Sequence, residues 1–163
     1  MRDSLGGIRR LQIAMTDSDR WASLHRILAR EVPEVAAGAV ELRAVARAPG
    51  HRTKLAVTSL VPDLDPIGAC VGRKGRRAQA IVGALGGERI DILPWSDFPE
   101  QFVKLALAPA RVRVVELDLN HHLAVAHVDP DQVQLAHGKD DVNLLLAIEL
   151  TGWDIEIVAT DAA

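Results

Sequence analysis

Apolar residues recur along the first half of the chain with a spacing that switches between helical and extended periods. Four of them share one side of a helix beginning near Asp17 or Ser18, either of which would serve as its cap: Trp21, Leu24, Ile27 and Leu28. Pro33 and a turn at Pro49-Gly50 separate the runs that follow. The elements expected in this half are a helix over 17–30, strands over 39–46 and 54–59, a short apolar segment over 67–71, a helix over 76–85 and a strand over 90–92.

The second half repeats this order of elements. We expect a helix over 97–107 with Asp97 as its cap, strands over 112–117 and 123–128, a short helical segment over 132–136, a helix over 142–150 and a strand over 153–158. Gly72 and Gly138 occupy matching places in the two halves, 66 residues apart. A fixed offset of this kind indicates an internal repeat.

Each half therefore follows the order α-β-β-α-loop-α-β, with a glycine-hinged loop before its last helix. In the first half this loop has the pattern Gly-x-x-Gly, from Gly72 to Gly75. That arrangement is the plan of a KH domain, whose loop clamps the backbone of a nucleic acid. The fold class predicted is α+β, with two tandem type II KH domains, each a small three-stranded sheet covered by helices.

Several runs resemble consecutive blocks of the bacterial NusA family. They are Glu31 to Val35, Ala44 to Arg47, Gly50 to Val57, Asp65 to Gly72, Gly87 to Trp95 and Leu150 to Ile155. The resemblance extends over about residues 10 to 158. It implies single-stranded RNA as the ligand, a role in transcription elongation, termination or antitermination, and RNA polymerase or other transcription factors as further partners. The domains implied are a tail over 1–16 that resembles the last strand of an S1 domain, a first KH domain over 17–97 and a second over 98–160.

The second loop departs from the family pattern. Where the family has Gly-Lys-x-Gly-Gln-Asn, this chain has the run Gly138-Lys139-Asp140-Asp141-Val142-Asn143. Two carboxylates would repel a phosphate, and the freedom of the closing glycine is lost. We therefore expect the second KH domain to be degenerate for RNA binding and retained for packing.

Charge is divided unevenly between the two halves. The net charge of the chain is −3, but residues 1–97 hold 15 Lys and Arg against 11 Asp and Glu, whereas residues 98–163 hold 4 against 11. A polyanion is therefore expected on the first half.

The first loop carries the strongest functional signal. Its glycines would let backbone amides approach phosphate at the start of a helix, and four cations lie within five positions; the residues expected to bind RNA here are Gly72, Arg73, Lys74, Gly75, Arg76 and Arg77. Arg52 and Lys54 are also expected to bind RNA, as an extension of this basic surface, with an exposed strand end as the open alternative. No aromatic-rich stacking surface is expected, because aromatic residues make up 3% of the chain.

Other classes of site find little support in the sequence. The loop lacks the Walker and Rossmann patterns. His121, His122, His127 and His137 have no zinc-site spacing, and Cys70 stands alone, so neither metal nor cofactor is expected. No nucleophile–base or acid–base constellation suggests an enzyme. Without an apolar leader or spanning segment, we expect a cytoplasmic protein that does not bind membranes.

A rival interpretation is a protein-interaction module derived from NusA that has lost RNA binding. The acidic second half favours it. The Gly-Arg-Lys-Gly-Arg-Arg run of the first loop argues against it.

Overall fold

The computed structural model describes residues 17–161, which form two compact units that divide between Trp95 and Ser96. The stretch 1–16, including the run that resembles an S1 strand, lies outside the described residues.

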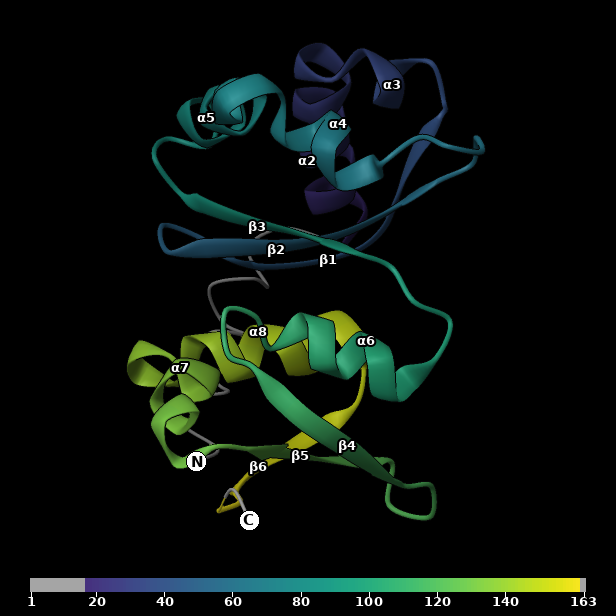
Figure 1. Ribbon diagram of the computed structural model, residues 1–163. Coiled ribbons are helices and arrows are strands. Elements are labelled where there is room, and N and C mark those ends of the chain that lie inside the picture. The colour runs from purple at the N-terminus through teal and green to yellow at the C-terminus, as the bar shows by residue number, and fades with distance from the viewer. Residues whose placement is uncertain (1–16, 162–163) are drawn as a thin grey trace. The chain divides into compact units, whose positions relative to one another are not determined.

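The first unit has a three-stranded sheet with its helices on one face (Figure 1). Its elements are α2 (Asp17–Glu31), α3 (Pro33–Ala36), β1 (Val40–Ala48), β2 (Arg52–Ser59), α4 (Pro66–Val71), α5 (Arg76–Ala84) and β3 (Arg89–Pro94). The central strand β2 pairs antiparallel with β1 and parallel with β3. The chain therefore crosses from β2 to β3 through α4 and α5, as a parallel pair requires.

The core of this unit lies between the helices and the sheet. The buried cluster consists of Leu24, Leu28, Val32, Val35, Val40, Leu42, Leu55, Val57, Cys70 and Ile81. Leu24 and Leu28 come from the apolar side of α2 that the spacing predicts, and Ile81 comes from α5. This packing fixes α5, and with it the loop that precedes α5.

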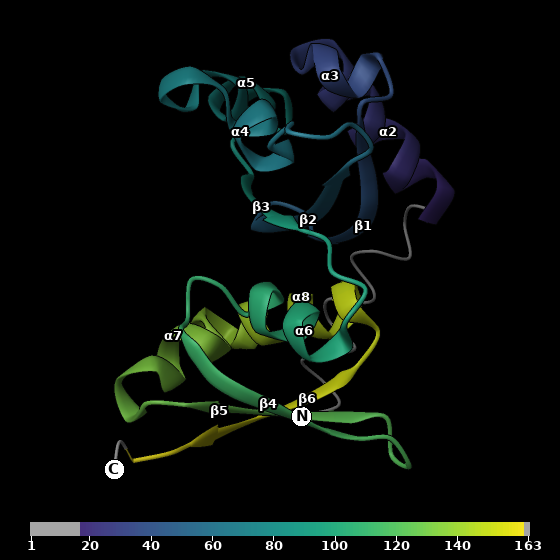
Figure 2. The same ribbon diagram turned by 45° about the vertical axis from the view of Figure 1, so that its right-hand side comes forward.

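The second unit repeats the architecture (Figure 2). Its elements are α6 (Pro99–Ala106), β4 (Val112–Asp118), β5 (Leu123–Val128), α7 (Val133–His137), α8 (Val142–Thr151) and β6 (Asp154–Ala159). Strand β5 is central, antiparallel to β4 and parallel to β6. Both figures show α6, α7 and α8 on one face of this sheet.

Proline sets the ends of two helices, and one local expectation fails because of it. Helix α6 begins at Pro99 with Phe98 at the N-cap position, so Asp97 is not the cap. Pro33 separates the two runs as expected, since α2 ends at Glu31, and it also begins the short helix α3. Proline is favourable at the first helical position, where its missing N–H costs nothing and its φ already suits the helix.

Candidate nucleic-acid interface

The loop between α4 and α5 has an unusual backbone. Gly72 ends α4 with φ 76° and ψ 172°, and a 3-10 turn, Arg73–Gly75, follows. Within the turn, Lys74 has φ 56° and ψ 27°, and Gly75 is left-handed with φ 72°. The amide of Gly75 donates to the carbonyl of Gly72 at 3.1 Å, which closes the turn before α5 begins.

Gly72 is required at its position for a steric reason as well as for its positive φ. A Cβ built on Gly72 would lie 2.6 Å from Cγ of Arg77 and 2.9 Å from its Cβ. Gly75 differs, because a Cβ there would meet nothing within 4 Å. The first glycine thus permits a close approach, whereas the second supplies only its left-handed conformation.

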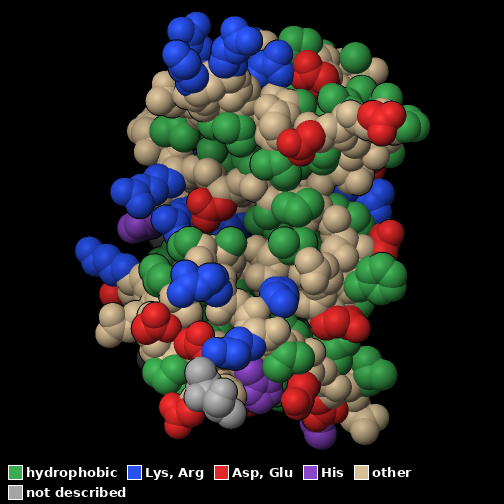
Figure 3. All heavy atoms as spheres, viewed as in Figure 1, with side chains coloured by type: hydrophobic (Ala, Val, Ile, Leu, Met, Phe, Trp, Pro, Cys, Tyr) green, Lys and Arg blue, Asp and Glu red, His purple; other side chains and the backbone are tan. Residues whose placement is uncertain are grey.

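Three of the four predicted loop cations are presented to solvent. Arg73, Lys74 and Arg76 are exposed, and within the described residues their side chains have no hydrogen bond or ion pair. Figure 3 shows Lys and Arg side chains gathered on the side of the first unit where α4 and α5 lie. Charges of one sign on a loop that opens a helix form a surface suited to phosphate.

The fourth cation, Arg77, is held by the protein itself. Its Nη1 donates to Oε2 of Glu34 at 2.7 Å and to the carbonyl of Ala69 at 2.7 Å. Its side chain is 34% exposed. The charge run in the sequence gave no sign that one of its four members is paired with α3.

Arg52 and Lys54 lie apart from the loop cations. Leu55 and Val57 of β2 belong to the core cluster, so the alternation of a strand directs residues 52 and 54 to the opposite face of the sheet. Lys54 is fully buried, with Nζ 3.4 Å from Oδ2 of Asp91, and Arg52 pairs with the same carboxylate at 3.6 Å. Burial lowers the pKa of Lys54 below its ordinary value, although Asp91 opposes the shift. These contacts give no support to the prediction that Arg52 and Lys54 extend the basic surface of the first loop.

A buried carboxylate that the sequence analysis missed fixes the β1–β2 turn. Glu88, which is 3% exposed, accepts hydrogen bonds from the side chains of Arg47 and Thr53 and from the amide of Gly50. Burial alone would raise the pKa of Glu88, but these hydrogen bonds outweigh it and hold the pKa below its ordinary value. Its signal in the sequence was a single acidic residue beside Gly86-Gly87, which predicts nothing by itself.

The second loop keeps the backbone of the first. Gly138 has φ 74° and ψ 172°, Asp140 has φ 54° and ψ 30°, and Asp141 has φ 61° and ψ 15°. Each value lies close to that of the residue 66 positions earlier. Nδ1 of His137 lies 3.0 Å from Oδ1 of Asp141. The shape of a KH loop is therefore present, and its charge is reversed.

Sequence comparison assigns the two units to two related domain families. The NusA-like first KH domain family matches residues 20–95, and the NusA-like second KH domain family matches residues 99–163. The chain belongs to the NusA KH-domain family. The resemblance to NusA and the predicted α+β fold of two tandem KH domains are confirmed by these matches together with the two three-stranded sheets.

The relatives of this NusA KH pair are longer proteins. The transcription termination/antitermination protein NusA of Thermus thermophilus is 50% identical over 132 residues, which cover 81% of this chain and 34% of the relative. The NusA of Bacillus subtilis is 47% identical over 140 residues, covering 85% of this chain and 38% of the relative. The chain spans about a third of the length of the curated relatives it matches.

A solved crystal structure, that of APE1850, shares the fold. Its TM-score is 0.59 at 20% identity, and the match covers 83% of this chain and 96% of that chain. At this identity the likeness concerns the fold alone.

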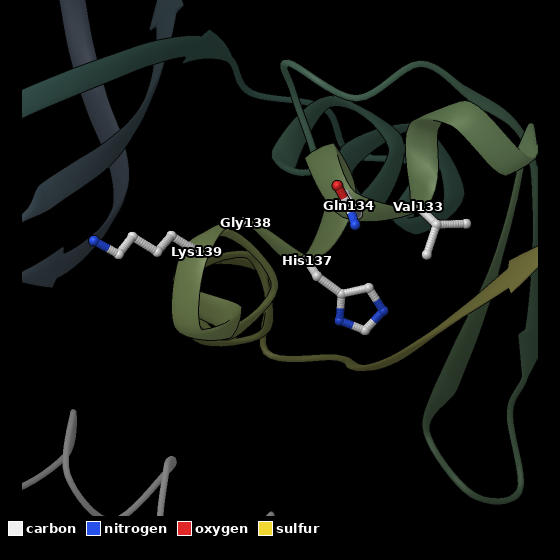
Figure 4. A pocket seen from close by; sticks show the side chains of 5 residues that line it. All are labelled: Val133, Gln134, His137, Gly138 and Lys139. Carbon is white, nitrogen blue, oxygen red and sulfur yellow. The ribbon is translucent and has the colours of Figure 1, made fainter.

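A shallow pocket lies beside the second loop of the NusA KH pair. It has a volume of about 380 Å³ and is lined by Val133, Gln134, His137, Gly138 and Lys139. Figure 4 shows that the side chain of Lys139 points away from His137. The pocket therefore has one titratable ring at its wall and no cation directed into it from the residues shown.

The histidines considered as metal ligands each have a separate neighbour. His121 lies against Asp118, His122 stacks on Trp153, and His127 contacts Thr160. Among residues 17–161, no group of three His, Cys, Asp or Glu side chains is arranged to hold a metal ion. Over the same residues, every helix is too short or too polar to cross a bilayer.

Cys70 lies in the core directly before the first loop. Burial, followed by the nearby Glu34, raises the pKa of its thiol to about 11. A thiol with this pKa is protonated at neutral pH, so Cys70 packs as a small apolar side chain.

Proposed function

We propose that the first unit binds single-stranded RNA through the loop between α4 and α5. Arg73, Lys74 and Arg76 would hold phosphates, while Gly72 and Gly75 let the backbone approach them. The single observation that carries this proposal is the exposure of these three unpaired cations on a left-handed glycine loop. Arg52 and Lys54 are left out, because they share Asp91 on the other face of the sheet.

The domain boundaries proposed are 17–97 for the first KH domain and 98–160 for the second. We further propose that the second domain does not hold RNA through its loop, because Asp140 and Asp141 stand where Lys74 and Gly75 stand in the first. At neutral pH both carboxylates would face the phosphates of any strand that followed the same path.

The names of the relatives support a role in transcription termination and antitermination, and we extend this role to elongation. In this proposal the chain acts on RNA in the cytoplasm, with RNA polymerase or other transcription factors as further partners. No reaction is proposed for it, and no cofactor is needed to hold RNA.

A protein-interaction role is the second candidate, and the acidic second unit favours it. Residues 98–163 carry 11 acidic and 4 basic residues, so this unit would attract a basic partner rather than RNA. The two candidates make opposite predictions for RNA binding by the whole chain.

The test is a fluorescence-anisotropy titration of a labelled single-stranded RNA of mixed sequence over a series of salt concentrations. Arg73→Gln/Lys74→Gln is compared with Arg111→Gln/Lys104→Gln, which removes the same charge from the second unit. We expect the first pair to weaken binding at least tenfold at low salt and to reduce the salt slope by about 1.4, at about 0.7 for each contact with a single strand. The control pair should change neither quantity.

Two outcomes would overturn the proposal. Failure of the wild-type chain to bind RNA at low salt would reject RNA binding and favour the interaction module. Equal losses in the two pairs would show that binding depends on total charge and not on the loop.

A further inference from the structure

Arg77 differs from the other loop cations in what its guanidinium contacts. Its Nη1 lies 2.7 Å and 3.3 Å from the two oxygens of Glu34 and 2.7 Å from the carbonyl of Ala69. These acceptors belong to α3 and to α4. The charge-assisted bonds therefore connect α5, which carries Arg77, to two helices that precede it in the chain.

The stem of the same side chain lies under the loop. Cγ, Cβ and Cδ of Arg77 are the atoms that a Cβ on Gly72 would meet, at 2.6, 2.9 and 3.0 Å. If the stem moved, the backbone at Gly72 would lose the surface against which it rests. The contact with Glu34 fixes where that stem lies.

The second unit supports this role independently. Asn143 stands 66 positions after Arg77, and a Cβ on Gly138 would lie 2.7 Å from its Cβ. The buried Nδ2 of Asn143 donates to the carbonyls of Leu107, Leu135 and Ala136. Leu135 is 66 positions after Ala69, so the same carbonyl is held in both units. An uncharged side chain thus performs the same bracing in a loop that carries carboxylates.

We propose that Arg77 positions the RNA-binding loop instead of contacting phosphate, and that Glu34, through Arg77, sets the affinity of the loop for RNA. This inference rests on the proposed function of the first unit. The carboxylate of Glu34 does not contact the RNA in this proposal. It strengthens RNA binding by holding Arg77, whereas direct repulsion between a carboxylate and phosphate would weaken binding.

Glu34→Gln gives the sharpest test, because the two interpretations differ in sign. Removing a carboxylate beside an RNA site should tighten binding if charge alone matters. If Glu34 holds Arg77 in place, the same change should weaken binding by about three- to tenfold, since it replaces a charge-assisted bond with a weaker one. The salt slope should stay at its wild-type value.

Arg77→Met and Arg76→Met form a matched pair, since both remove a guanidinium and retain an unbranched stem. Arg76→Met should lower the salt slope by about 0.7, whereas Arg77→Met should weaken binding without changing the slope. The double variant Glu34→Gln/Arg77→Met should bind no more weakly than Arg77→Met alone, because both changes break one contact. Circular dichroism at the titration temperature selects conditions in which every variant is folded, so a loss of stability alone would leave the affinities unchanged.

Tighter binding by Glu34→Gln, or a reduced salt slope in Arg77→Met, would overturn the inference and make Arg77 a phosphate ligand. Neither result would disturb the proposed function, which fails only if the wild-type chain does not bind or if the Arg73 and Lys74 changes have no specific effect.

Discussion

Asp141 has nearly the same backbone conformation as Gly75, with φ 61° and ψ 15° against φ 72° and ψ 15°. An aspartate can adopt this left-handed conformation, although less readily than glycine. The second loop thus retains the geometry of the first while carrying carboxylates at Asp140 and Asp141. The two loops therefore share a backbone conformation but differ in the charge of their side chains.

Transplanting the first loop should therefore create a second RNA site. The substitutions Asp140→Lys, Asp141→Gly and Val142→Arg give the second loop the residues found 66 positions earlier, on a backbone that already fits them. We expect RNA affinity to rise at least threefold and the salt slope to increase by about 1.4 from the two added cations. Anisotropy titration of the triple variant measures both quantities.

The control for the transplant is Asp154→Lys/Glu156→Arg, which adds two cations to exposed positions on β6. If this control gained as much affinity as the transplant, overall charge would account for the effect and the loop geometry would not.

Substitution of the two glycines in the first loop should have unequal costs. Gly72→Ala places a Cβ against the stem of Arg77 at a positive φ, so we expect the free energy of unfolding to fall by about 3 kcal/mol. Gly75→Ala meets no atom and should cost about 1 kcal/mol from its backbone conformation alone. Urea denaturation measures both variants, and equal costs would show that the close approach at Gly72 is relieved by movement of Arg77.

Lys54→Met should leave RNA binding unchanged, because the ammonium is buried against Asp91. We expect Kd to stay within about twofold of the wild type, while the free energy of unfolding falls by about 2 kcal/mol as Asp91 loses a charged partner. Arg73→Met is the matched comparison, with weaker binding and unchanged stability. An RNA affinity lowered as much by Lys54→Met as by Arg73→Met would return Lys54 to the binding surface.

Glu88 should make the stability of the first unit sensitive to acid. The folded-state pKa of Glu88 is held below its unfolded value, so the ionised carboxylate stabilises the fold at neutral pH. That stabilisation is lost as the pH falls from the unfolded pKa, about 4.3, through the lower folded value. Glu88→Gln should cost about 3 kcal/mol at pH 7, and the cost should shrink toward pH 3.

Glu41→Gln is the control for Glu88, since the Glu41 side chain is 44% exposed and lies 3.6 Å from Arg43. It should change stability by less than about 0.5 kcal/mol over the same pH range. A cost for Glu88→Gln that did not vary with pH would mean that the amide loses packing or geometry and that ionisation is unimportant.

The sequence predicted the order of the elements because the apolar periods of the two halves are clear and repeat. It also located the first loop, where Gly72 and Gly75 enclose two cations. What it did not predict depends on side-chain direction. Arg77 was grouped with Arg76 because neighbours in a charge run look alike, yet successive residues of a helix point about 100° apart, and only one of the two meets Glu34.

Lys54 shows a related limit of the sequence pattern. Its strand reads as Arg-Thr-Lys-Leu-Ala-Val, which suggests a polar face at residues 52 and 54, but β2 is the central strand and five of its consecutive residues are buried. Burial of a polar side chain in a central strand depends on what covers each face, which the strand's own sequence does not encode. Asp97 illustrates a smaller limit, since proline at residue 99 set the start of α6 more strongly than a nearby acidic cap.

The parallel pairing of β2 with β3 has a consequence for the newly made chain. The hairpin of β1 and β2 joins neighbouring segments and can form once both strands have left the ribosome. β2 cannot pair with β3 until β3 has been synthesised, because Arg52 lies opposite Arg89. The glycine loop lies within that interval, between β2 and β3. The sheet of a nascent first unit can therefore be completed only after β3 has emerged.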